Sequence, residues 1–176
     1  MQACIRLIKP ADLAEVQAIQ DCCYGDELFE DTALIESRLL SQPNSCWLAQ
    51  NHDGKVLAYL FSYPSRDKRV APLGSEFERY NDATLLYLHD MAVSPTARGL
   101  GLAPELLATA ERYAIMCGLN QLALVAVQGS VPYWQKQGFS VVELTEVSAL
   151  QALESYQGQN AVYMQKKLST VKVGRF

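Results

Sequence analysis

The chain has 176 residues, of which 49% are hydrophobic and 19% are charged, and its formal net charge is −4. These values are ordinary for one domain with a core of its own. The chain has no run dense in Lys and Arg, so nucleic acid is not expected as a partner. No apolar stretch approaches the roughly 18 residues that a membrane span needs.

Cysteine and histidine usage predicts a reducing compartment and no metal. Five cysteines are scattered without a Cys-x-x-Cys pair, and the N-terminal residues lack a secretory signal. Free thiols are the economical interpretation, so we expect a cytoplasmic protein. His52 and His89, the two histidines, are not spaced as zinc ligands, and no metal site is predicted.

The first half of the chain alternates strand and helix patterns. Pro10 occupies a position that the first turn of a helix tolerates, and Asp53-Gly54 carries a hairpin signal. An acidic connector, residues 26–31, joins two amphipathic patterns. The predicted elements are a strand at 4–8, a helix from 10 to about 23, a helix around 34–40, strands at 46–50 and 56–63, and a long polar loop at 64–82.

The second half predicts a strand at 85–93, a helix at 104–117, a strand at 122–127, a short helix at 131–137, and strands at 139–144 and 161–168. This order predicts an α/β fold with a mixed sheet of about six to seven strands, flanked by about four helices. We expect one domain over residues 1–168, followed by a C-terminal tail over 169–176.

A glycine-rich loop, residues 98–103, precedes the helix of the second half. Small residues let the backbone approach a ligand, and unpaired amides at a helix start favour an anion. Because Arg98 adds positive charge, the loop predicts a pyrophosphate site, although a plain turn explains the glycines equally well. No Gly-Lys-Ser/Thr sequence follows Gly101, and Pro104 stands where a dinucleotide fingerprint has its third glycine, so both of those motifs are disfavoured.

Two longer motifs resemble a known family. Residues 88–95, Leu-His-Asp-Met-Ala-Val-Ser-Pro, with Arg98-x-x-Gly101-x-Ala103 after them, resemble the acetyl-CoA signature of the GNAT superfamily of N-acetyltransferases. Residues 133–139, Tyr-Trp-Gln-Lys-Gln-Gly-Phe, resemble its second signature, in the family's order and spacing. A narrower resemblance, carried by Leu88-His89-x-x-Ala92-Val93, Pro104 and Val131-Pro132-Tyr133, is to the aralkylamine (serotonin-type) branch.

The resemblance implies a GNAT-like fold and an acetyl-CoA-dependent N-acetyltransferase. It implies that backbone groups of Met91, Ala92 and Val93 bind the pantetheine and polarise the thioester carbonyl, which is the stabilisation that acyl transfer needs. It is also compatible with a homodimer. The other residues implied in coenzyme binding are Arg98, Gly99, Leu100, Gly101, Leu102, Ala103, Pro104 and Trp134.

His89 is the predicted general base. An alkylamine has a pKa near ~10.4, so freeing its lone pair at neutral pH costs roughly 4–5 kcal/mol, and a histidine can receive that proton. In the aralkylamine branch a histidine stands at this position, and a second one stands where this chain has Tyr87, which could relay a proton. A hydrogen-bonded structural histidine is the alternative. With regular pairing Asp90 faces the opposite side of the strand, and it is interpreted as structural.

Trp134 departs from the family pattern. Many relatives have a tyrosine there that protonates the departing thiolate, and an indole cannot be that acid. Expelling a thiolate with a pKa near ~8.5 costs only roughly 2 kcal/mol at neutral pH, so the departure is expected to slow the reaction rather than abolish it. Tyr133 could substitute as the acid, and packing explains it as well.

The acceptor is predicted to be a primary amine, most simply a small aralkylamine that attacks the thioester directly in a ternary complex. Two alternatives stay open: a protein N-terminus or lysine as the acceptor, and an acyl-CoA-binding regulatory module without catalysis. The loop at 64–82 favours a lidded pocket. The connector at 26–31 lies where relatives shape the acceptor pocket, and a solvated cluster at a helix start explains it too.

Overall fold

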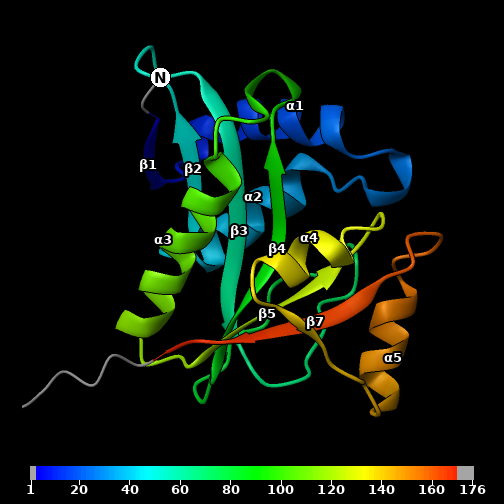
Figure 1. Cartoon of the computed structure of the whole chain (residues 1–176). Helices are drawn as coiled ribbons and strands as arrows, with labels where there is room; N and C mark the ends of the chain where they lie inside the picture. Colours follow the sequence, from blue (N-terminus) through cyan, green and yellow to red (C-terminus); the bar gives the residue numbers. More distant parts are fainter. Residues whose placement is uncertain (1–2, 170–176) are drawn as a thin grey trace, which may run out of the picture.

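A seven-stranded sheet runs through the computed structural model, which describes residues 3–169 (Figure 1). The strand order is β1-β2-β3-β4-β5-β7-β6, with β4 and β5 parallel and the other neighbours antiparallel. The predicted mixed α/β fold is therefore confirmed. Of the predicted tail, residues 170–176 lie outside the described residues.

The strands are β1 (Cys4–Leu7), β2 (Cys46–Gln50), β3 (Val56–Ser65), β4 (Leu85–Val93), β5 (Gln121–Ala126), β6 (Ser140–Val141) and β7 (Val162–Lys167). The α-helices are α1 (Leu13–Cys23), α2 (Thr32–Ser41), α3 (Leu102–Met116), α4 (Val131–Lys136) and α5 (Val147–Glu154). Short 3-10 turns cover Pro10–Asp12, Asp26–Leu28 and Pro95–Ala97.

Two elements differ from the prediction. The strand expected at 139–144 pairs with β7 only at Ser140 and Val141, and both of these residues are exposed. Helix α5 was not predicted, although its apolar residues recur at the helical spacing. It buries the small residues Ala149 and Ala152, whereas Val147 and Leu150 face solvent.

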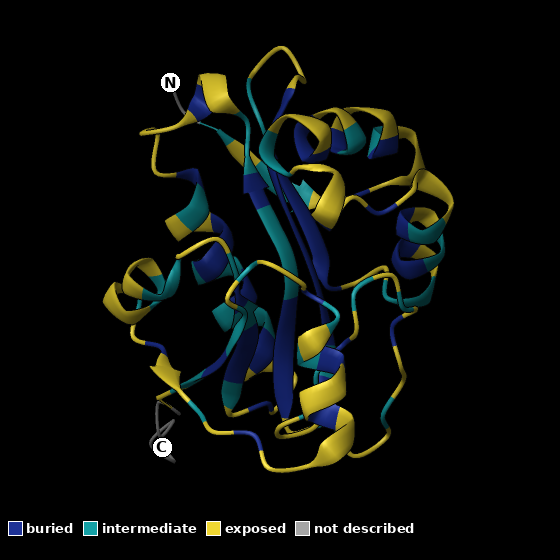
Figure 2. Ribbon diagram, turned by 90° about the vertical axis from the view of Figure 1, so that its right-hand side faces the viewer, coloured by how far each residue is buried: buried dark blue, intermediate teal, exposed yellow. Residues whose placement is uncertain are grey.

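The sheet separates two hydrophobic cores (Figure 2). Helices α1, α2 and α5 pack on one face, together with buried residues of the loop between β3 and β4. Helix α3 packs on the other face, where Leu106 and Ala110 have no exposed surface, and α4 adjoins it. Residues of α3 spaced by three and four supply this buried stripe, as the helical period requires.

A bulge in β4 changes which way its side chains face. Phe61 of β3 pairs with Asp90 and Ser62 pairs with Leu88, so His89 is an extra residue in β4. Across such a bulge two consecutive residues face the same side of the sheet. Asp90 Oδ2 accepts a hydrogen bond from the Tyr59 hydroxyl at 2.8 Å in the α1-side core, where His89 also lies. The expectation that Asp90 faces away from His89 is therefore wrong.

Beyond the bulge, β4 and β5 separate. Their parallel pairing covers Leu85–Leu88 of β4 and Gln121–Leu124 of β5, and the two strands diverge after it (Figure 1). Residues 90–93 of β4 pair with β3 but with no strand on the other side. The sheet is thus open along one edge of β4, next to the loop that precedes α3.

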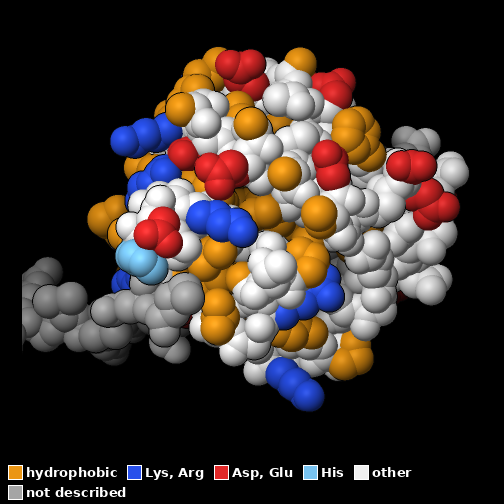
Figure 3. All heavy atoms as spheres, turned by 90° about the horizontal axis from the view of Figure 1, so that it is seen from above, with side chains coloured by type: hydrophobic (Ala, Val, Ile, Leu, Met, Phe, Trp, Pro, Cys, Tyr) orange, Lys and Arg blue, Asp and Glu red, His pale blue; other side chains and the backbone are white. Residues whose placement is uncertain are grey.

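None of the helices in residues 3–169 has the length and apolar character needed to cross a bilayer. On the face seen from above, acidic and basic side chains are interspersed with hydrophobic ones, and neither sign forms a continuous patch (Figure 3).

Candidate functional site

A cleft of about 1410 Å³ occupies the space where β4 and β5 diverge. It brings together six residues that the sequence predicted for the site. They come from β4, from the glycine loop, from the first turn of α3 and from α4: His89, Met91, Arg98, Ala103, Tyr133 and Trp134. Gln128 and Ser130, from the turn after β5, complete the polar part of its lining.

The glycine loop has the backbone geometry of an anion site. Gly99 and Gly101 have φ angles of +81° and +76°, in the left-handed region that glycine adopts without strain. The first hydrogen bond within α3 runs from the Glu105 amide to the Gly101 carbonyl, so the amides of Leu102 and Ala103 precede the intrahelical ladder. Together with the dipole of a 15-residue helix and Arg98 at the cleft, they suit a pyrophosphate.

The open edge of β4 supplies the second set of backbone groups. The Tyr24 hydroxyl donates to the Met91 carbonyl at 2.9 Å, and the Cys23 thiol donates to the Val93 carbonyl at 3.3 Å. Both carbonyls therefore point away from β3, and the amides of the same residues point with them. An extended thioester arm lying along this edge would find amide donors for its carbonyl oxygen.

The remaining predicted coenzyme residues serve the structure of the loop. The side chains of Ala92 and Leu102 are buried in the two cores, whereas Leu100 is exposed. Pro104, in the first turn of α3, has no amide hydrogen to leave unpaired. The backbone of Leu100 and Leu102 is available to a ligand, whereas the backbone groups of Ala92, between Met91 and Val93, point towards its partner Tyr59 in β3.

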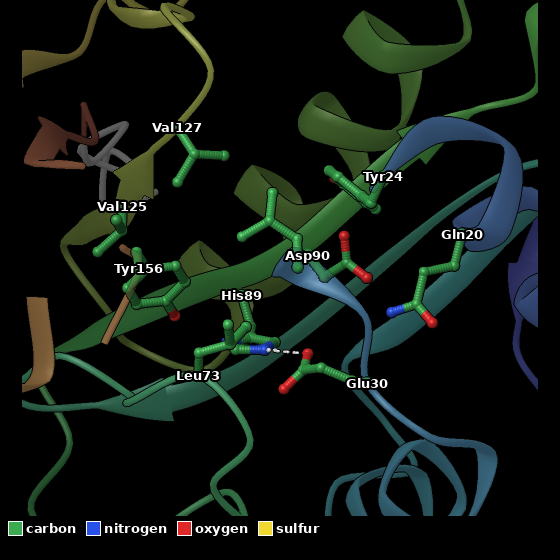
Figure 4. Close-up of a pocket in the computed structure, with 10 residues that line it drawn as sticks. Gln20, Tyr24, Glu30, Leu73, His89, Asp90, Val125, Val127 and Tyr156 are labelled. Atoms are coloured by element: carbon green, nitrogen blue, oxygen red, sulfur yellow. Dashed lines mark hydrogen bonds and ion pairs between the residues drawn. The ribbon is translucent and has the colours of Figure 1, made fainter. Parts of the chain in front are cut away.

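A second, smaller cavity adjoins the cleft, and its roughly 370 Å³ of empty space includes the part that is open to solvent. In Figure 4 valines and Tyr156 lie on one side of it and Gln20 and Tyr24 on the other, with His89, Asp90 and Glu30 between them. Leu73, from the long loop between β3 and β4, also lines this cavity. The residues that line both spaces are Tyr24, His89, Asp90, Val125 and Val127, so the two spaces meet at the bulge of β4.

A buried ion pair holds one side of this cavity. Arg38 donates to both carboxylate oxygens of Glu30, at 2.7 and 2.6 Å, and the Gly74 amide donates to Glu30 Oε2 at 2.9 Å. Burial alone would raise the pKa of Glu30, but His89 and Arg38 outweigh it and hold that pKa well below its ordinary value. Arg38 also donates to the Ser75 carbonyl, which ties the long loop to α2.

The ionised Glu30 fixes the tautomer of His89. His89 Nε2 lies 3.1 Å from Glu30 Oε1, and the side chain of His89 is 3% exposed. Because a carboxylate can only accept, we assign the hydrogen of the ring to Nε2. In the neutral ring the lone pair is therefore on Nδ1, which is buried and has no hydrogen-bond partner among the described residues. The base role of His89 stays a prediction, and it would have to use Nδ1.

Asp90, next to His89, is the second titratable group where the spaces meet. Burial raises the pKa of its carboxyl, although His89 and the hydroxyls of Tyr59 and Tyr24 favour the ionised form. No Lys or Arg within the described part of the chain forms an ion pair with it. Asp90 is thus a carboxylate in a poorly hydrated position without a lysine or arginine partner among the described residues.

The two tyrosines predicted for catalysis lie in different surroundings. Tyr87 is 1% exposed within the aromatic cluster of the α1-side core and lines neither cavity. Burial raises the pKa of its hydroxyl well above the ordinary value, so it keeps its proton. Tyr133 lines the cleft, beside Trp134, and burial raises its pKa as well. The relay and acid roles of these two residues remain predictions.

Several residues of the small cavity carried no signal in the sequence. Within the acidic connector, Glu30 is buried and paired, so the solvated interpretation is wrong for it, whereas Asp26 and Glu27 are exposed as expected. The spacing of Glu30 and Arg38 by eight residues is no motif. Other residues that sequence reasoning missed are Gln20, Leu28, Leu73, Val125 and Tyr156.

An open strand edge, a glycine loop at a helix start and an adjoining small cavity define a protein that binds an acylated nucleotide carrier beside an acceptor. Comparison with known families agrees with this class. The model of the Acetyltransferase (GNAT) family matches residues 13–139. The chain belongs to this family, and it is an acetyl-CoA-dependent N-acetyltransferase with acetyl-CoA as its cosubstrate.

Solved structures share the fold at low sequence identity. The loading GNATL domain of CurA from Lyngbya majuscula has a TM-score of 0.73 and 14% identity, covering 95% of this chain and 98% of that one. The GphF GNAT-like decarboxylase, in complex with isobutyryl-CoA, has a TM-score of 0.71 and 16% identity over 94% and 100%. A putative phosphinothricin N-acetyltransferase has a TM-score of 0.69 and 16% identity over 96% and 99%. A search of curated protein sequences found no match.

The glycine loop yields a prediction with a matched control. Gly101→Ala and Gly54→Ala each place a side chain at positive φ, where no neighbouring atom would obstruct the new Cβ, so each should destabilise the protein by about 1–2 kcal/mol. Only Gly101→Ala should also weaken coenzyme A binding, because Gly54 lies in the β2–β3 hairpin. Calorimetric titration with coenzyme A measures this, and equal affinities in the two variants would contradict the proposed anion site.

The buried ion pair yields a second prediction. Glu30→Gln leaves the Arg38 guanidinium buried without a counter-charge and should lower the free energy of unfolding by about 3–5 kcal/mol. Asp82→Asn, which breaks the exposed pair with Arg66, should cost at most about 1 kcal/mol. Urea unfolding of both variants measures the difference.

The same pair sets a pH dependence. Since the pKa of Glu30 is depressed in the folded state, its stabilisation is complete above the ordinary pKa of a glutamate and is lost as the pH falls towards the folded-state value. The stability gap between the wild type and Glu30→Gln should therefore narrow in acid. A gap that stays constant from neutral pH to pH about 3 would contradict the ionised Glu30.

Proposed function

We propose that this enzyme acetylates the primary amine of a small molecule. The observation that carries the proposal is the small cavity that joins the coenzyme cleft at His89 and Asp90. An amine held there would face a thioester lying along the open edge of β4. Direct attack in a ternary complex then needs no covalent intermediate on the protein.

The lining of the cavity supports an acceptor with a cationic end and an apolar body. Asp90 contributes a carboxylate, and the Glu30 charge is already matched by Arg38. Tyr24, Tyr156 and aliphatic side chains form the rest of the walls. This composition agrees with the aralkylamine class that the motifs resemble.

The long loop along one side of the cavity favours a small molecule over a peptide. Leu73 lines the cavity, and the next two residues of the long loop bond through their backbone to Glu30 and Arg38. A peptide acceptor would need a groove through which its chain could continue. The ordered loop instead covers this side of the cavity, in keeping with a lid.

Thiol release from acetyl-CoA, measured against a panel of aralkylamines, polyamines and peptides, tests the proposal. We expect release with amines that carry one compact apolar group, and at least a tenfold lower kcat/KM with peptides of any N-terminal residue. A preference for peptides would contradict the proposal and indicate that the acceptor is a protein amine. Coenzyme binding without release for any amine would overturn the proposal.

A further inference from the structure

We propose that Asp90, rather than His89, binds the ammonium group of the acceptor and takes the proton that must leave before the amine can attack. The inference rests on the proposed function, because it concerns the cavity in which the amine would bind. It assigns that cavity a chemical requirement: the acceptor enters as a cation, with its apolar body directed away from Asp90.

Position is the first argument. The bulge places Asp90 on the same face as His89, and Asp90 lines both the small cavity and the cleft. The Tyr59 hydroxyl binds Oδ2 and orients the carboxylate, which Figure 4 shows between Tyr24 and Glu30. A group at this junction can contact an amine in the small cavity and also faces the cleft in which the thioester would lie.

Availability is the second argument. Three titratable side chains line both spaces: Tyr24, His89 and Asp90. The Tyr24 hydroxyl donates to the Met91 carbonyl, and burial raises its pKa, so it is no base at neutral pH. His89 Nε2 is bound to Glu30, and Nδ1 is enclosed by protein. The Tyr59 hydroxyl engages only Oδ2 of Asp90, and the residue lines both spaces, so Oδ1 is the carboxylate oxygen that is left for a ligand.

Charge is the third argument. The groups that face Asp90 are Cys23 and Tyr24 at the end of α1, Glu30 of the connector, Tyr59 of β3 and the adjacent His89. Arg38 neutralises Glu30 through two hydrogen bonds, but no described Lys or Arg pairs with Asp90. A bound ammonium would supply the missing cation. Burial also raises the pKa of Asp90 towards the range in which a carboxylate can accept a proton from an amine.

The proton balance is simple. One proton passes from the ammonium nitrogen to the free oxygen of the Asp90 carboxylate, and the neutral amine attacks the thioester carbon. The C–N bond forms and the C–S bond breaks, with the electron pair leaving on sulfur. The second proton of the nitrogen neutralises the thiolate, directly or through water, and Asp90 returns its own proton to solvent before the next turnover.

Three variants separate Asp90 from His89. Asp90→Asn keeps the shape and an oxygen for the Tyr59 hydroxyl but removes the charge. It should lower kcat/KM near neutral pH by about 100-fold or more, which is the contribution of a general base. The loss should shrink as the pH approaches the pKa of the amine, where the substrate deprotonates itself. His89→Gln should reduce activity less and retain an acidic limb, shifted to higher pH because His89 favours the ionised form of Asp90.

Tyr59→Phe gives a readout that a structural role would not move. The hydroxyl of Tyr59 favours the ionised carboxylate, so its removal should raise the pKa of Asp90 and shift the acidic limb of kcat/KM to higher pH. Thermal protection by coenzyme A reports whether each variant is folded. If Asp90→Asn does not fold, the direction of the Tyr59→Phe shift decides.

Failure of the inference is distinguishable from failure of the proposed function. A wild type that releases thiol with no amine contradicts both. If the wild type acetylates small amines, two results overturn only the assignment to Asp90. The first is an acidic limb of kcat/KM that survives Asp90→Asn. The second is an acidic limb that disappears in His89→Gln and does not move in Tyr59→Phe.

Discussion

One extra residue in β4 decides the geometry of the site. His89 has no pairing partner in β3, and at the same point β4 stops pairing with β5. A regular strand would continue the ladder and close the sheet. The bulge lets β4 stay attached to β3 while its other edge opens, so that backbone groups which would otherwise bind β5 become available to a ligand.

The bulge also has a chemical consequence. It turns two successive titratable side chains to one face, where strand alternation would place them on opposite sides. The protein therefore has an imidazole and a carboxylate side by side at the junction of two cavities, and the two groups have different hydrogen-bond partners. His89 is bound to Glu30, whereas Asp90 accepts one hydrogen bond, from the Tyr59 hydroxyl at Oδ2.

The buried pair of Glu30 and Arg38 shapes this arrangement. Removing two charges from water is costly, and the mutual attraction of the ions often only offsets that cost. What the pair contributes here is geometry. Its hydrogen bonds connect the acidic connector, α2, the long loop and β4, which are far apart in the chain. Arg38, His89 and the Gly74 amide all lie within hydrogen-bond distance of Glu30. Of the two carboxylates that line the small cavity, Asp90 is the one without an arginine partner.

Local patterns in the sequence determined most of the fold and pointed to several residues that line the cleft. The bounds of β2 and β4 were predicted correctly, and the glycine loop, Met91, Arg98 and Trp134 lie at the cleft. Strand alternation, helical periodicity and glycine at positive φ depend on neighbouring residues, so a single sequence displays them. The small cavity is different, since Glu30, Leu73, Asp90 and Tyr156 meet there from distant segments. The bulge, the buried ion pair and the facing of Asp90 depend on how β4 pairs and what packs on it, and only the tertiary structure decides that.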